Sequence, residues 1–186
     1  VVPDYRLVPQ VRWPAFVEDG AAALKWTFAN IASHGGDPAR VAVMGHSAGA
    51  HIALLLALDR RWGVADGIKA AVGLAGPTDF LPFAPGGAAA AALGNAADLN
   101  DTQPIHFARA DAPPLLLLHG GKDTTVLPRN SQRLANAVTD LGGRAEVIIY
   151  PDVSHVGILL ALSKPFRGRA PALTDASNFL ARVLAS

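Results

Sequence analysis

The sequence has no cysteine among its 186 residues, which excludes a disulfide framework and thiol chemistry but does not place the protein in a compartment. Its charges nearly cancel, to a formal net charge of +1, so composition gives no reason to expect nucleic acid or an acidic membrane surface as a partner. No apolar run reaches the length that a membrane-spanning helix needs. The six histidines show neither H-x-x-x-H spacing nor a cysteine partner, and therefore predict no metal site.

What the chain does contain is an alternation of apolar strand signals and helix signals. The hydrophobic fraction of 51% suits central strands that helices cover on both faces. We predict one α/β domain over residues 1–186, built on a mostly parallel sheet with helices on both of its faces. The expected strands are 1–5, 41–44, 68–74, 115–118 and 146–150, and the expected helices are 14–34, 51–58, 131–141 and 171–184.

The most informative segment is G-H-S-A-G at 45–49, because an apolar strand precedes it and a helix-forming run follows it. This context is typical of a nucleophile elbow, in which a sharp turn lifts the serine hydroxyl clear of the sheet edge. The N-terminal amides of the following helix point at the same spot, where they stabilise negative charge. Ser47 is the predicted nucleophile, and the backbone N–H of Ala48 is the predicted oxyanion donor.

A serine hydroxyl needs a base, and the base needs an acid that orients it. On elbow-bearing sheets the acid follows the serine in the chain and the histidine follows the acid. Asp123 comes after a buried-strand run and a Gly-Gly turn, and His155 ends the loop after strand 146–150. Both would lie at the carboxyl edge of a parallel sheet, as Ser47 does, and ligands bind at that edge. We therefore predict His155 as general base and Asp123 as the residue that holds its tautomer.

The other polar residues near these positions have plainer interpretations. Asp152, three residues before the predicted base, is the main rival for the acid, and Asp79 is a more distant one. Asp123 is preferred because it occupies a turn at a strand end. We expect His46 to shape the surroundings of the elbow rather than to transfer protons, and His51 to be a structural histidine.

Several segments together carry a resemblance to a known family. They are D-Y-R-L-V-P at 4–9, P-A-F at 14–16 followed by Asp19, G-G-D-P at 35–38, G-H-S-A-G at 45–49, H-G-x-x-D at 119–123 and the terminal His155. In these segments the chain resembles the α/β-hydrolase esterases, more narrowly the carboxylesterases near the feruloyl-esterase-like, hormone-sensitive-lipase-like and arylformamidase groups. The resemblance covers essentially the whole chain. It implies an α/β-hydrolase fold, a serine hydrolase without a cofactor, and a triad at Ser47, Asp123 and His155.

One part of the family pattern has no counterpart in this sequence. Related enzymes usually carry an H-G-G-G-like loop upstream of the D-Y-R-L segment, and its N–H groups form half of the oxyanion hole. We therefore expect an N-terminally incomplete hydrolase that lacks the N-terminal strands and this loop. The strand at 1–5 would then have no proper partner, and the strand at 41–44 would be an unpaired, aggregation-prone edge.

Residues 76–112 form the least regular stretch, at the place where related hydrolases carry a cap or lid. One interpretation is that this stretch shapes the substrate pocket, with Phe80, Leu81 and Phe83 as an apolar wall for the acyl group. The other is an ordinary surface loop with core anchors.

The predicted function is hydrolysis of carboxylic esters with small to medium acyl chains, through an acyl-enzyme on Ser47. An arylformamidase is the alternative enzyme, because G-H-S-A-G-A-H also looks like that group. A catalytically impaired fragment or binding module is the alternative without turnover. The expected partner is a small-molecule ester. A cytoplasmic location is favoured, although a signal peptide would lie upstream of Val1.

Overall fold

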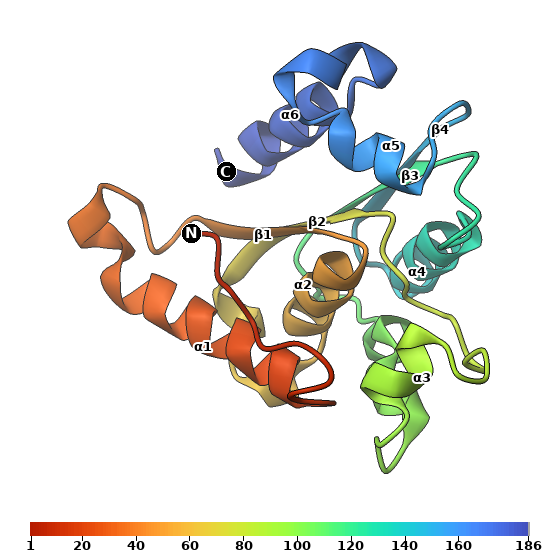
Figure 1. Ribbon diagram of the computed structural model, residues 1–186. Helices are drawn as coiled ribbons and strands as arrows, with labels where there is room; N and C mark the ends of the chain where they lie inside the picture. The colour runs from red at the N-terminus through yellow and green to blue at the C-terminus, as the bar shows by residue number, and fades with distance from the viewer. Residues whose placement is uncertain (186) are drawn as a thin grey trace.

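The computed structural model describes residues 1–185 (Figure 1). Its regular elements, in chain order, are α1 (Ala15–Asn30), β1 (Val41–His46), α2 (Ala48–Leu58), β2 (Ile68–Leu74), α3 (Ala88–Leu93), β3 (Leu115–Gly120), α4 (Arg129–Asp140), β4 (Ala145–Tyr150), α5 (His155–Leu160) and α6 (Ala172–Leu184). Short 3₁₀ helices lie at Ile31–His34, Arg60–Trp62, Ala65–Gly67, Leu99–Thr102, Pro104–Phe107 and Lys164–Arg169. None of the helices within residues 1–185 has both the length and the apolar character needed to cross a membrane.

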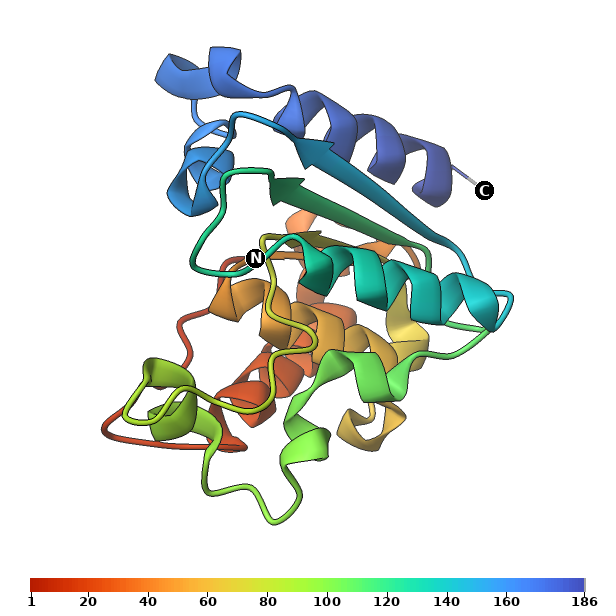
Figure 2. The same ribbon diagram turned by 90° about the vertical axis from the view of Figure 1, so that its right-hand side faces the viewer.

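The four strands form one parallel sheet in the order β1-β2-β3-β4. Their carboxyl ends therefore meet at one edge, and Figure 2 shows the arrowheads of β3 and β4 pointing the same way. The register keeps these ends level, because His46 pairs with Leu74 at the end of β2 and Gly120 pairs with Tyr150 at the end of β4. The segments that follow β1, β3 and β4 all leave from this edge.

Helices cover both faces of the sheet, in three layers (Figure 1). On β3, Leu115 and Leu117 pack into the core shared with α1, α2 and α4, whereas Leu116 and Leu118 pack into the core shared with α5 and α6. All four leucines are buried. Successive side chains of a strand point to opposite faces, so a strand covered on both faces reads as an unbroken apolar run. The expected α/β architecture is confirmed.

The expected strand at 1–5 is wrong. The first residues form no strand: the chain starts near β1 and runs away from it toward the beginning of α1 (Figure 1), and Pro3 has no N–H to donate to a ladder. The segment is instead attached to α1, because the backbone N–H and guanidinium of Arg6 donate to the carboxylate of Asp19 at 2.8–3.2 Å. β1 is an edge of the described sheet, as expected, and Met44 on it is 42% exposed.

The irregular stretch at 76–112 is anchored by buried amide side chains. The Oδ1 atom of Asn130, in the first turn of α4, accepts hydrogen bonds from the backbone N–H groups of Thr78 and Asp79, each at 2.9 Å. The Oε1 atom of Gln103 accepts one from the N–H of Phe80 at 2.9 Å. These contacts hold the segment after β2 close to the carboxyl edge of the sheet.

Candidate active site

Ser47 lies in a sharp turn between β1 and α2, with φ 53° and ψ −119°. This conformation is sparsely populated for a residue with a side chain and persists only where the surroundings fix it. Here the Ser47 N–H donates to the carbonyl of Leu74 at 2.9 Å, and the Ser47 carbonyl accepts from the N–H of His51 at 3.0 Å. The turn is therefore held by β2 on one side and by α2 on the other, which is the geometry of a nucleophile elbow.

The two glycines of the motif have different structural roles. A Cβ on Gly45 would collide with the backbone of Gly49, so the close approach of strand and helix requires glycine at 45. A Cβ on Gly49 would meet nothing within 4 Å among residues 1–185, and its φ is not in the left-handed region. The close packing of the turn therefore requires glycine at position 45 but not at position 49.

The three residues predicted from the sequence come together at the carboxyl edge of the sheet. His155 Nε2 lies 2.9 Å from Ser47 Oγ, and His155 Nδ1 lies 2.7 Å from Asp123 Oδ2. The other carboxylate oxygen, Oδ1, accepts hydrogen bonds from the N–H groups of Thr125 and Val126, both at 2.9 Å. Asp123 is 2% exposed, so its carboxylate is buried. His155 begins α5 rather than ending a loop.

A second histidine, which the sequence analysis does not assign to the site, contacts the predicted acid Asp123. His119 is buried; its Nε2 donates to the carbonyl of Val126 at 2.8 Å and lies 3.3 Å from Asp123 Oδ2. Its Nδ1 accepts from the hydroxyl of Ser131 at 2.7 Å. Burial lowers the pKa of His119, so the ring is a neutral donor that supports the carboxylate. The H-G-x-x-D spacing was the available signal, because it places His119 four residues before the acid around one turn.

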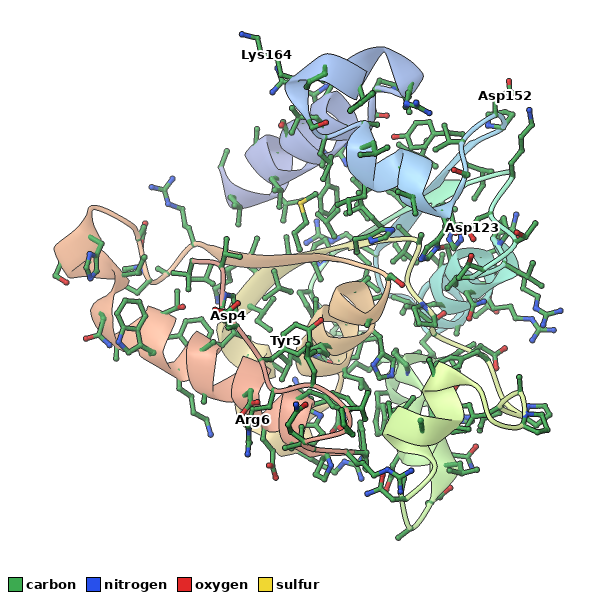
Figure 3. The ribbon with its side chains drawn as sticks, in the orientation of Figure 1. Asp4, Tyr5, Arg6, Asp123, Asp152 and Lys164 are labelled. Carbon is green, nitrogen blue, oxygen red and sulfur yellow. The ribbon has the colours of Figure 1, made fainter. Side chains whose placement is uncertain are left out.

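The rival acids point elsewhere. Asp152 is exposed at the tip of the loop after β4 (Figure 3), where it pairs with Lys122 at 2.7 Å. Asp79 pairs with Arg133 at 2.6 Å. Neither carboxylate is hydrogen-bonded to a histidine, so the geometry favours Asp123 as the orienting acid.

His51 has the buried environment expected of a structural histidine. Its Nε2 donates to the carbonyl of Thr102 at 2.6 Å, and burial lowers its pKa to about 4. The ring also meets Phe80 edge-on, with centroids 5.8 Å apart. His51 therefore ties α2 to the irregular segment that flanks Ser47.

The N–H of Ala48 lies at the start of α2, next to the predicted nucleophile Ser47. Within residues 1–185 it donates to no acceptor, as the first amides of a helix do when nothing caps them. Free amides at a helix N-terminus attract negative charge. The N–H of the predicted oxyanion donor is thus free to bind an acceptor within the described chain.

A cavity of about 780 Å³ adjoins Ser47 and Ala48. Its walls come from four parts of the chain: the N-terminal segment with Phe16 of α1, the elbow with the start of α2, the irregular stretch, and residues 124–130, which run from the turn after β3 into α4. Phe80 and Leu81 line it, whereas Phe83 packs against the ring of Phe80, with centroids 5.5 Å apart, and does not reach the cavity. Of the aromatic residues expected at the acyl wall, one therefore faces this space and the other supports it.

Comparison with known proteins identifies the family of this chain. Residues 1–138 match the BD-FAE family. The chain belongs to the BD-FAE family. Esterase LipQ of Mycobacterium tuberculosis is 30% identical over 193 residues, which cover 92% of this chain and 45% of LipQ. Isoprenylcysteine alpha-carbonyl methylesterase ICME of Arabidopsis thaliana is 29% identical over 199 residues, which cover 92% of this chain and 46% of ICME. This BD-FAE chain thus spans about half the length of these curated relatives.

The fold of this BD-FAE chain also occurs among solved structures. A truncated form of a carbohydrate esterase from gut microbiota superposes with a TM-score of 0.84 at 21% identity, covering 98% of this chain and 73% of that one. The fold is therefore the α/β-hydrolase fold that the sequence resemblance implied. The relatives named above are esterases, and they give the arylformamidase alternative no support.

Proposed function

We propose that this chain carries the catalytic site of a serine hydrolase that cleaves carboxylic esters, with Ser47 as nucleophile, His155 as base and Asp123 as orienting acid. The observation that carries the proposal is the hydrogen-bonded series from Ser47 Oγ through both ring nitrogens of His155 to Asp123, at 2.9 and 2.7 Å. Membership of the BD-FAE family and esterase relatives support the same reaction class.

The reaction follows from the positions of these atoms. Ser47 Oγ attacks the ester carbonyl while His155 Nε2 takes its proton, and the tetrahedral oxyanion forms beside the N–H of Ala48. His155 then gives the proton to the departing alcohol. Water repeats the sequence on the acyl-enzyme and releases the acid. Asp123 stabilises the positively charged imidazole, and its own carboxylate is held by the two backbone N–H groups and by His119.

The cavity beside Ser47 supports a preference for esters of small to medium acyl chains. Residues 76–112 act in this proposal as a cap that supplies the apolar wall. Phe80 and Leu81 contact the acyl group, and Phe83 supports them from behind. The substrate is a small molecule, because a cavity of about 780 Å³ is of the size that drug-sized ligands occupy.

The test is a panel of p-nitrophenyl acetate, butyrate and decanoate, with N-formylkynurenine beside them. We expect ester turnover that disappears in Ser47→Ala, with no comparable formamide turnover. Phe80→Ala should shift the preference toward longer chains, because removing the ring enlarges the cavity, while Phe83→Ala should shift it less. Undiminished ester turnover in Ser47→Ala, or faster formamide than ester cleavage, would contradict the proposal.

A further inference from the structure

We propose that His46 is a positioning residue, which ties the segment carrying the base to the strand carrying the nucleophile. The inference rests on the triad proposed above. His46 is the last residue of β1 and directly precedes Ser47, and His155 is the first residue of α5. His46 Nε2 donates to the backbone carbonyl of His155 at 2.9 Å. The bond therefore fixes the main chain from which the His155 ring projects.

The need for such a tie follows from the strand order. β1 and β4 are the two outer strands of the described sheet, so the nucleophile and the base follow strands that share no ladder. The base segment is tied to the acid turn by two main-chain bonds, from Gly121 N–H to the Tyr150 carbonyl at 2.7 Å and from Lys122 N–H to the Val153 carbonyl at 3.0 Å. Acid and base are thus held together independently of the nucleophile.

The elbow is tied to the base more sparsely. Between residues 45–50 and 151–160, the hydrogen bonds within the described chain are those of Ser47 and His46 with His155. The first of them must break and re-form during the reaction, because it carries the transferred proton. The second involves only a carbonyl and a ring N–H that take no part in proton transfer. It therefore keeps the distance between nucleophile and base while the first one changes.

The ring of His46 also restricts the ring of His155. The two centroids lie 4.8 Å apart, with the planes tilted by 47°. The His155 imidazole is therefore bounded by Asp123 at Nδ1, by Ser47 at Nε2 and by His46 on one face. The charged and titratable groups around His46 are His155, Asp123 and His119.

The neutral state of His46 suits this position. Partial burial lowers the pKa of His46, which keeps the ring uncharged near neutral pH. A neutral ring still donates its Nε2 proton to the carbonyl. It does not oppose the positive charge that His155 acquires when it takes the proton of Ser47, as a charged neighbour would.

A matched pair of variants isolates the hydrogen bond. In His46→Gln the side-chain amide extends about as far as Nε2 of the histidine and can donate to the same carbonyl, whereas in His46→Asn a similar amide falls short of it. We expect His46→Gln to keep kcat within about threefold of the unsubstituted protein. We expect His46→Asn to lose about 10–100-fold in kcat with KM unchanged, because small misplacements of a reacting group are costly. His106→Gln, at an exposed histidine outside the triad and the cavity lining, is the control and should keep both constants.

A second measurement follows the nucleophile directly. The second-order rate constant of Ser47 phosphonylation by a fluorophosphonate should fall in His46→Asn and not in His46→Gln, in parallel with kcat. Circular dichroism checks the folding of each variant. If His46→Asn does not fold, His46→Phe takes its place, because phenylalanine has no hydrogen-bond donor in its side chain.

Two outcomes would overturn the inference: a kcat in His46→Gln no higher than that in His46→Asn, or an effect of His46→Asn that is confined to KM. Failure of the underlying function would look different. In that case Ser47→Ala itself would retain ester turnover. If Ser47→Ala loses turnover but His46→Gln and His46→Asn have equal kcat values, only the role of His46 is rejected.

Discussion

At the scale of single residues, the histidines of this protein differ in burial and in hydrogen-bond partners. Three of them near the site, His46, His51 and His119, have pKa values that burial lowers, so each is a neutral hydrogen-bond donor to a backbone carbonyl. His155 differs in its partners, because its ring joins a carboxylate to a hydroxyl. One residue type therefore supplies both the proposed base and the residues that support the site.

The buried His51 makes a prediction about stability in acid. Its pKa is about 4 in the folded protein and about 6.5 in an unfolded chain, so the unfolded state gains a proton first as the pH falls. The free energy of unfolding should therefore decrease between about pH 6.5 and pH 4, by roughly 3 kcal/mol from this residue. Urea unfolding at pH 7 and pH 4.5 measures the decrease. His51→Gln, which keeps a donor but does not titrate, should show a smaller decrease; an equal one would contradict the assignment.

At the scale of elements, strands buried on both faces are the most predictable from the sequence. β2 begins and ends at the expected residues, because the apolar run 68–74 packs against both helix layers. Amphipathic α4 and α6 were also located to within a few residues. The prediction of a strand at 1–5 is wrong, because this segment forms no hydrogen-bonded ladder with a neighbouring strand. α2 begins at Ala48 rather than at 51, since the elbow leads directly into the helix and propensity alone does not show such a start.

The elbow itself yields a prediction that separates its glycines. Gly45→Ala should lower the free energy of unfolding by about 1–3 kcal/mol or more, because the new methyl group would overlap the backbone of Gly49. Gly49→Ala should not lower it, because the site is open in the described chain and alanine favours a helix by up to about 1 kcal/mol over glycine. Urea unfolding of the two variants is the measurement. Equal destabilisation would mean that the motif requires both glycines for folding.

At the scale of the whole molecule, parallel topology made the site predictable in outline. Ser47, Asp123 and His155 follow three strands of one sheet, so their meeting at its carboxyl edge could be inferred from chain order. The contact of His119 with Asp123 lies within one turn, and the H-G-x-x-D spacing was a local signal for it. The contact of His46 could not be inferred, because it depends on how the end of β1 meets the segment after β4. The same holds for the cavity, whose walls come from four separate parts of the chain.

The central claim is that Ser47 is a nucleophile activated by His155 and Asp123, and covalent labelling tests it most directly. The protein is incubated with a fluorophosphonate, digested, and mapped by mass spectrometry. We expect a single adduct on the peptide that contains Ser47, no adduct in Ser47→Ala, and labelling slowed by two or more orders of magnitude in Asp123→Asn, because the orienting acid sets the tautomer of the base. Labelling at another residue, or none at Ser47 in the folded protein, would contradict the account.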